Sequence, residues 1–406
     1  MPSSRGRQAP RFLLVIDRTT DIKVYGSGFG HGVGLSQFGA CGRALAGQDY
    51  VRILRAYYQD VSLKQYPDDP TMRVLLGEQD PNGRQDVAVR PGTRALMRNL
   101  ATDGTLVLGP GAYRVQHLAN RGLYGLTNLA EGRAVGSYRG PIRFEPISEG
   151  LLGYGHRCYR GFLAVQILDS KVCVINQLPI ESYLQGVVAN EMFASWPLEA
   201  LKSQAIAARS YARATQRGDH FDVYPDTRDQ VYGGFASETF ATNEAIASTA
   251  RSCAVHDGNP IMAAFHSASG GYTEDTSFVF DTSHTLGTAP YLQASRDLDS
   301  EGRPFEGPAY ANSPCLSWSG ALDADGSPGL GIGAIVAVTV LGRSPSGRLT
   351  KIKVTGRQGE RIVSGEYDIR SSLKTTGLRL ADGSAYPAGI LPSARVSFCG
   401  AACVQS

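Results

Sequence analysis

The chain has 406 residues, of which 42% are apolar and 19% charged, and its formal net charge is +3. This composition is typical of a globular protein with a sizeable core, and it excludes a disordered or low-complexity protein. The weak, evenly spread positive charge does not indicate a nucleic-acid partner. No run of about 18 apolar residues is present, so we expect no transmembrane segment. The apolar run at residues 12–16 is too short for a clear signal peptide, so export would need another route or an upstream segment.

The cysteines are scattered and include no C-x-x-C pair, which argues against a zinc framework. Cys399 and Cys403 lie close enough in sequence to pair, and buried free thiols are the alternative.

The first unusual element is the stretch 26–40, GSGFGHGVGLSQFGA, in which glycine occupies every second position from 26 to 34 around His31. In an extended strand this alternation would place the glycines on one face. Such a face predicts close approach by a ligand or by another chain segment, or a strained backbone. The spacing does not fit nucleotide-binding loops. Two interpretations remain open: a functional site that contains His31, and a packing seam in which His31 is hydrogen-bonded for structural reasons.

The elements that follow alternate between helix and strand. Residues 49–61 predict a helix with Asp49 as N-cap. Residues 71–178 carry short β-rich runs separated by turn residues, the pattern of an all-β or barrel-like section. Residues 179–218 are predicted to be helical. From residue 250 strands return, with one hairpin turn at Asp257-Gly258 and a last hairpin within 334–356.

The helical part carries a candidate catalytic carboxylate. An apolar stripe at helical spacing continues to Glu191, and it is formed by Ile180, Tyr183, Leu184, Val187 and Val188. Burial on this face would raise the pKa of the glutamate and allow it to donate a proton near neutral pH. The alternative is a helix that frays after Gly186 and leaves Glu191 exposed or ion-paired.

A second helix is predicted to begin after Ser195-Trp196-Pro197 and to stop at Gly218. Its alanines make it thin, so neighbouring elements can approach it closely. Gln204 and Tyr211 share one side of it. Arg209 lies beside them, where it could pair with an anionic group, pair with Glu191, or remain solvated.

Farther along, the segment AFHSASGGYTED places His266 on a strand followed by a polar, glycine-rich turn. It lacks the G-x-S-x-G elbow of serine hydrolases, and the chain has no H-E-x-x-H. Hydroxyls at such a strand end suit hydrogen bonding to sugars.

Together these segments resemble the SpoIID/LytB family, the stage II sporulation protein D type of bacterial peptidoglycan-cleaving proteins and amidase enhancers. The matching blocks lie within residues 24–298, and the longest is LPIESYLQGVVANEMFASWPLEALKSQAIAARSYA. The resemblance implies that Glu191, in the block N-E-M-F-A-S-W-P, is the acid/base of a lytic transglycosylase. Asn190 and Phe193 depart from the commoner Ala and Pro of this motif but leave the carboxyl in place.

The resemblance also implies a set of glycan-binding residues. These are His31, Ser36 and Gln37 in the glycine-rich block; Gln204, Arg209 and Tyr211 on the helix after the glutamate; Gln230 and Tyr232 in the Q-V-Y block; and His266, Ser267, Ser269, Gly270 and Gly271 in the H-S-x-S-G-G block. Some relatives hold zinc through cysteines around the Q-V-Y block. Tyr224 and Asp229 flank it in this chain, so we expect no metal and no cofactor.

A lytic transglycosylase needs only one carboxyl, because the C6 hydroxyl of the substrate attacks its own anomeric carbon, whereas ordinary glycosidases use two. The expected products are 1,6-anhydro-muramic ends, and the resemblance suggests a preference for strands without stem peptides. Asp222, Asp226 and Asp229 are the candidates if a second carboxylate takes part. The main alternative is a non-catalytic glycan binder that stimulates a cell-wall amidase, and a carbohydrate-binding adhesin built on residues 71–178 is a third interpretation. The family leads us to expect an extracytoplasmic protein.

The expected fold is α+β, a helical catalytic core packed with antiparallel sheets and an inserted, barrel-like β-rich section. The expected parts are an N-terminal extension (1–23), the glycine-rich block and helix (24–70), the β-rich section (71–178), the catalytic core (179–298) and a β-rich C-terminal part that completes the core (299–406).

Overall fold

The computed structural model describes residues 22–78, 86–118, 121–215, 217–280, 289–325 and 328–399. The chain forms two compact units. Unit 2 is the continuous stretch Val61–Ala263, and unit 1 combines the chain up to Asp60 with the chain from Ala264 onward. Each unit is considered separately below.

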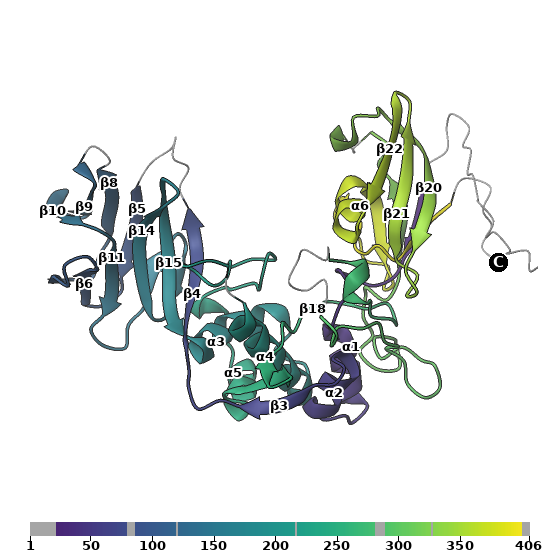
Figure 1. The fold of residues 1–406 in the computed structure, drawn as a ribbon, viewed down its shortest axis with the longest axis horizontal. Coiled ribbons are helices and arrows are strands. Elements are labelled where there is room, and N and C mark those ends of the chain that lie inside the picture. The colour runs from purple at the N-terminus through teal and green to yellow at the C-terminus, as the bar shows by residue number, and fades with distance from the viewer. Residues whose placement is uncertain are drawn as a thin grey trace, which may run out of the picture. The chain divides into compact units, whose positions relative to one another are not determined.

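The fold is a mixture of helices and mostly antiparallel sheets, which confirms the expected α+β class (Figure 1). The helices are α1 (Gln37–Leu45), α2 (Tyr50–Tyr57), α3 (Ile180–Glu191), α4 (Leu198–Ala214), α5 (Phe240–Ser248) and α6 (Glu366–Ser372). Within the described ranges, no helix is both long and apolar enough to cross a membrane.

Two six-stranded antiparallel sheets form the β-rich section of unit 2. One has the order β4 (Thr71–Glu78), β15 (Lys171–Pro179), β14 (Phe162–Leu168), β11 (Ile142–Pro146), β6 (Ala95–Asn99) and β7 (Thr105–Leu108). The other has the order β10 (Arg133–Arg139), β9 (Leu123–Asn128), β8 (Tyr113–Leu118), β5 (Asp86–Pro91), β12 (Leu152–Tyr154) and β13 (Arg157–Tyr159). The predicted strands are therefore present, but across the described residues they form two sheets with free edges, and the barrel-like closure expected from the sequence is wrong.

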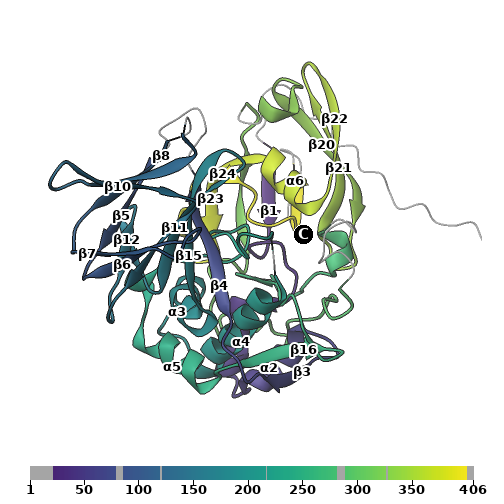
Figure 2. The same cartoon turned by 60° about the vertical axis from the view of Figure 1, so that its left-hand side comes forward.

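The helical part of unit 2 consists of α3, α4 and α5, which contact one another. Both views show them at the same end of strands β4 and β15 (Figures 1 and 2). Helix α4 is thin where its neighbours approach, because its alanines at 200, 205, 207, 208 and 212 are buried. Helix α3 follows β15 directly and continues to Glu191 without fraying after Gly186. Helix α4 ends at Ala214, before the predicted stop at Gly218, because Thr215 is already extended.

A three-stranded sheet completes unit 2, in the order β17 (Asn259–Pro260), β16 (Ser252–His256) and β3 (Ser62–Gln65). The predicted hairpin turn between β16 and β17 is confirmed, since Asp257 and Gly258 both have left-handed φ values, 49° and 80°.

Unit 1 contains a five-stranded sheet in the order β24 (Gly389–Ile390), β23 (Lys374–Leu380), β19 (Trp318–Leu322), β1 (Lys23–Gly26) and β25 (Val396–Cys399). A second sheet consists of β20 (Ile335–Arg343), β21 (Leu349–Gly356) and β22 (Gly359–Ser364), so the predicted last hairpin is confirmed. Both sheets contribute to one apolar core, in which Val24, Ile352 and Ile369 are fully buried. The predicted helix at 49–61 is present as α2, with Asp49 accepting a hydrogen bond from the Arg52 N–H at 2.8 Å, but it is shorter because Tyr58 is extended.

The glycine-rich segment is not an extended strand. Beyond β1, Gly28, Gly30, Gly32 and Gly34 have φ values of 79°, 96°, 85° and 71°, which only glycine adopts readily. Other chain segments lie against them: a Cβ at Gly34 would come 2.0 Å from the carbonyl oxygen of Ala264. The expectation of a strained path with close approach is therefore correct, and the extended alternation is wrong.

Five cysteines, at 41, 158, 173, 253 and 315, are free thiols. Cys403, the partner suggested for Cys399, lies outside the described residues.

Candidate functional site

The residues expected to form the site belong to two groups, one in each unit. Unit 2 holds Glu191, Gln204, Arg209, Tyr211, Gln230 and Tyr232. Unit 1 holds His31, Ser36, Gln37, His266, Ser267, Ser269, Gly270 and Gly271. The fold gathers residues that are distant in sequence within each group.

Glu191 is the last residue of α3, and its Oε1 accepts a hydrogen bond from the Val231 N–H at 2.9 Å. The five stripe residues before it are buried as predicted. Glu191 itself is only half-buried, because the chain becomes extended at Met192 and Phe193 is 63% exposed. The carboxylate thus lies at the margin of the core, held in place by the backbone of the 229–232 block.

Buried hydrogen bonds fix residues 229–232 to the core of unit 2. The Gln230 amide accepts from the Tyr183 hydroxyl at 3.2 Å and donates to the Ala208 carbonyl at 3.4 Å. The Tyr232 hydroxyl donates to Asn176 at 2.8 Å. Burial raises the pKa of both tyrosines, so they remain protonated donors. Gln230 and Tyr232 therefore fix the position of Val231, which holds Glu191.

Arg209 is completely buried and pairs with Glu181 rather than with Glu191. Its Nε and one Nη each lie 2.7 Å from a Glu181 oxygen, and the guanidinium also donates to the carbonyls of Ile246 and Ser252. Glu181 lies in the first turn of α3, whereas the sequence argument considered only the glutamate at the other end of that helix. The pair links α3 and α4 and reaches the end of α5.

Gln204 is also completely buried on α4. Neither its amide nitrogen nor its amide oxygen has a hydrogen-bond partner among the described residues. Such a group is costly in a core.

The three loop aspartates each pair with an arginine. Asp222 lies 2.7 Å from Arg73, Asp226 2.7 Å from Arg228, and Asp229 2.6 Å from Arg217. A hydrogen bond from Arg228 lowers the pKa of Asp226. The buried Asp229 also accepts from the Tyr211 hydroxyl at 2.8 Å. These interactions give all three carboxylates structural partners, and they give Tyr211 a structural role too.

In unit 1, β2 (Leu35–Ser36) pairs in parallel with β18 (Phe265–His266), which brings the glycine-rich block against the H-S-x-S-G-G block. His31 Nδ1 accepts from the Val33 N–H at 3.0 Å, and His266 Nδ1 lies 3.1 Å from the Val33 carbonyl, to which it must donate. Burial, followed by the charges of Arg370 and Arg348, lowers the pKa of His31 to about 4. Burial and His31 lower that of His266 well below its usual range. Both rings, 5.6 Å apart, are neutral at pH 7.

Two buried carboxylates, which the sequence did not lead us to expect, accept hydrogen bonds from the serines of this group. Glu306 accepts from Ser36 Oγ at 2.5 Å and from the N–H groups of Ser269 and Gly270. Asp297 accepts from Ser269 Oγ at 3.2 Å and pairs with Arg43 at 3.0 Å. Burial raises the pKa of both carboxyls. Asp297 ends the stretch PYLQASRD (residues 290–297), one of the blocks that carry the family resemblance, so the sequence held a usable signal for it. Nothing in the sequence around Glu306 marks that residue.

The remaining residues of the group also meet other parts of unit 1. The Ser267 carbonyl accepts from the Phe38 N–H at 3.0 Å, and Gln37 is buried at the start of α1. Gly270 and Gly271 have φ values of 68° and 91°, and a Cβ at Gly270 would meet Ser27 and Gly28. These contacts favour the packing-seam interpretation for the unit 1 group.

Over the described parts of the chain, no group of three or more His, Cys, Asp and Glu side chains is arranged to hold a metal ion.

Comparison with known sequences shows what the chain is similar to. The model of the stage II sporulation protein family SpoIID matches residues 168–256, which include every predicted site residue of unit 2. Over 274 residues the chain is 24% identical to the stage II sporulation protein D of Bacillus subtilis, a match covering 63% of this chain and 73% of that protein. The chain is similar to the SpoIID/LytB family.

Other similar proteins match the chain over shorter lengths. It is 44% identical over 115 residues to the amidase enhancer of Bacillus subtilis, covering 28% of this chain and 15% of the enhancer. It is 35% identical over 162 residues to an uncharacterised protein of Brachyspira hyodysenteriae, covering 39% of this chain and 42% of that protein. The chain thus spans less than half the length of these two relatives. No solved structure matches significantly.

Proposed function

We propose that this protein is a SpoIID/LytB family member that acts on the bacterial cell wall as a lytic transglycosylase, cleaving peptidoglycan glycan strands outside the cytoplasm. The observation that supports this most is the placement of Glu191. It lies at the end of a buried helix inside the family-matched segment, at the margin of the core, with a backbone N–H holding its carboxylate at 2.9 Å.

The proposed reaction uses this carboxyl twice. Protonated Glu191 gives its proton to the glycosidic oxygen as the bond from that oxygen to C1 of the muramic acid breaks. The carboxylate then takes the proton of the C6 hydroxyl of the same sugar as that oxygen bonds to C1, which closes the 1,6-anhydro ring. A two-carboxylate mechanism would require a second acid nearby. The arginine pairs of Asp222, Asp226 and Asp229 favour the one-carboxyl route.

The test is mass spectrometry of purified glycan strands, with and without stem peptides, after incubation with the protein. We expect anhydro-ended fragments from the wild type and none from Glu191→Gln. Glu199→Gln, the same change in the first turn of α4, is the matched control and should retain cleavage. Intact strands with the wild type, or equal cleavage by Glu191→Gln, would show that the catalytic proposal is wrong.

The second candidate is a glycan-binding enhancer of an N-acetylmuramoyl-L-alanine amidase. It is favoured by the identity of 44% to a protein named amidase enhancer. In this case glycan strands would be retained in a pull-down without being cut, and release of stem peptides by an added cell-wall amidase would increase equally with wild type and Glu191→Gln. A cell-wall amidase is thus the proposed protein partner of this alternative.

The unit 1 residues remain proposed glycan contacts, with His31 as the decisive one. If it contacts glycan, His31→Ala should weaken strand binding while the protein stays folded. Full affinity and full activity of this variant would leave the packing seam as the role of His31, in agreement with its hydrogen bond to Val33.

A further inference from the structure

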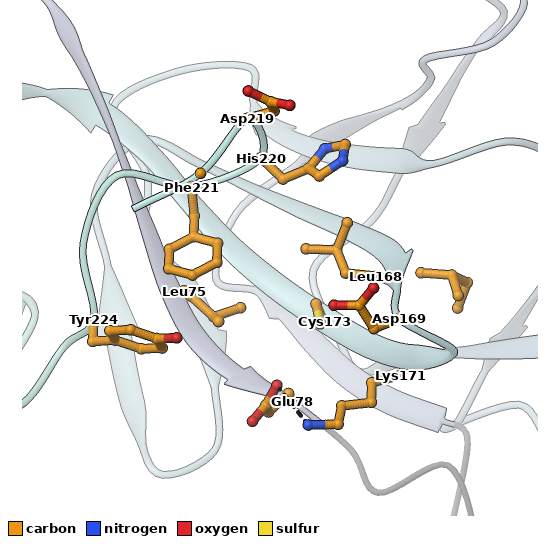
Figure 3. Close-up of a pocket in the computed structure, with 12 residues that line it drawn as sticks. Leu75, Glu78, Leu168, Asp169, Lys171, Cys173, Asp219, His220, Phe221 and Tyr224 are labelled. Carbon is orange, nitrogen blue, oxygen red and sulfur yellow. Dashed lines mark ion pairs between the residues drawn. The ribbon is translucent and has the colours of Figure 1, made fainter. Parts of the chain in front are cut away.

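Unit 2 contains a pocket of about 380 Å³ that none of the predicted site residues lines. It lies between the end of β4, the turn joining β14 to β15, and the loop 218–224 that follows α4 (Figure 3). Its volume is within the range of small-molecule sites, roughly 300–1,000 Å³. The pocket is separate from the contacts that hold Glu191.

The lining combines an apolar interior with a charged rim. Leu75, Leu168 and Cys173 line it together with the rings of Phe221 and Tyr224, whose centroids are 5.0 Å apart in an edge-to-face arrangement. Figure 3 shows Phe221 and Leu168 in the middle, the Glu78–Lys171 ion pair at one end, and Asp219 and His220 at the other. Aromatic rings beside hydrogen-bonding side chains suit a ligand with an apolar face and many hydroxyls.

The charges of the rim select among such ligands. Glu78, Asp169 and Asp219 are acidic, and Lys171, the single lysine of the lining, is already 3.2 Å from Glu78. A ligand carboxylate would therefore meet a net negative rim, whereas hydroxyl and amide donors would find acceptors.

The pocket also shares a loop with the catalytic candidate. Tyr224 donates its backbone N–H to the buried Asp229 at 2.8 Å, and two residues after Asp229 the N–H of Val231 holds Glu191. Arg217 and Tyr211 hold the same aspartate, so the loop is fixed at its middle. One end of this loop lines the pocket and the other end positions Glu191.

We propose that this pocket is a second saccharide subsite that takes a hexosamine unit without a carboxylate. The inference rests on the proposed glycan substrate and adds to it. The N-acetylglucosamine units of a strand would seat here in preference to the muramic acid units, which carry a lactyl carboxylate.

The test is calorimetric titration of the full chain with two probes: an N-acetylglucosamine tetramer, and a hyaluronan tetrasaccharide in which every second sugar is an acid. We expect the hyaluronan probe to bind about ten-fold more weakly, a difference of about 1.4 kcal/mol. Tyr224→Ala should weaken binding of the neutral tetramer about ten-fold or more, since the sugar would lose the ring on which it stacks.

A second variant guards against loss of folding. Asp169 is exposed in the β14–β15 turn with a φ of 46°, which asparagine tolerates, so Asp169→Asn should stay folded. This variant should bind the neutral tetramer several-fold more weakly, and the difference in affinity between the neutral tetramer and hyaluronan should become smaller. Asp103→Asn is the matched control, because Asp103 is an exposed left-handed aspartate (φ 57°) in the β6–β7 turn and does not line the pocket.

The outcomes distinguish failure of the subsite from failure of the proposed catalytic function. Unchanged tetramer binding in both pocket variants, or hyaluronan bound as tightly as the neutral tetramer, would show that the subsite is wrong. Pocket-dependent binding by a wild type that cuts no strand would support the subsite and contradict the transglycosylase. If Glu191→Gln weakened tetramer binding while Tyr224→Ala and Asp169→Asn left it unchanged, the subsite alone would be contradicted.

Discussion

At the scale of single residues, the Glu181–Arg209 pair joins the helices that carry the catalytic candidate. Arg209 is fully buried and Glu181 is 21% exposed. Removing one partner of such a pair leaves a charge in the core, and we expect Glu181→Gln to lower the free energy of unfolding by about 3 kcal/mol. Urea titration followed by circular dichroism measures this change.

The matched control is Glu199→Gln. Glu199 lies in the first turn of α4 as Glu181 does in α3, so both changes remove one acid from a helix N-terminus. The side chains of Glu199 and its partner Lys202 are 33% and 18% exposed, so solvent reaches both ends of this pair, whereas Arg209 is fully buried; the expected loss is below about 1 kcal/mol. Equal losses in the two variants would mean that Arg209 does not depend on Glu181.

His31 makes the stability depend on pH. Its pKa is about 4 in the folded chain against 6.5 in the unfolded one, so the unfolded chain binds more protons between these values. This contribution is complete above about pH 6.5 and is lost as the pH falls toward 4. Between pH 7 and pH 5 the loss is about 2 kcal/mol from this group.

Comparing wild type with His31→Asn removes this contribution from one protein, while His266, whose pKa is lowered mainly by burial and which acts in the same direction, is present in both. The pKa values of Asp297 and Glu306 are raised, so protonation of these carboxyls adds to the stability of the folded protein as the pH falls. This opposite effect is present in both proteins. Urea unfolding at pH 7 and pH 5 should show a smaller acid-induced loss in the variant. The same loss in both proteins would contradict a depressed pKa for His31.

At the scale of elements, the glycine-rich segment makes a sharp prediction about backbone packing. Gly34→Ala would combine a φ of 71° with a Cβ 2.0 Å from the Ala264 carbonyl oxygen. Gly47→Ala would have a similar φ, 81°, with no atom within 4 Å. We expect the Gly47 variant to lose about 1–2 kcal/mol of stability for the left-handed conformation and the Gly34 variant at least about 2 kcal/mol more for the clash. Thermal unfolding followed by circular dichroism compares them, and similar losses would show that the seam has room.

The same segment shows what the sequence could and could not predict. Local chemistry determined the Asp49 cap and the Asp257-Gly258 turn, and both are present where expected. The alternation of glycines correctly predicted close approach by another segment. Its period wrongly predicted a strand, because Gly28, Gly30, Gly32 and Gly34 have left-handed φ values.

Long-range partners were beyond sequence reasoning. Glu306 lies 270 residues from Ser36, and nothing in the local sequence predicts that its carboxylate accepts a hydrogen bond from the Ser36 hydroxyl. From the sequence, Glu191 was the one named acidic partner for Arg209, and only the packing of α3 on α4 selects Glu181 instead. Helix α1 gave no helical signal in the sequence, because it contains glycines at 39 and 42, which disfavour a helix. These glycines leave room for neighbouring segments: a Cβ at Gly42 would overlap the Phe305 carbonyl.

At the scale of the whole molecule, the continuity of unit 2 sets it apart from unit 1. Unit 2 is the single stretch Val61–Ala263, whereas unit 1 needs chain from both sides of it. A continuous stretch of this length with its own buried sheets and helices has enough core to fold alone. We therefore predict that a fragment comprising residues 61–263 unfolds in one cooperative thermal transition by circular dichroism, and that Glu181→Gln lowers its midpoint as it does in the full chain. A fragment without a cooperative transition would show that unit 2 depends on the rest of the chain to fold.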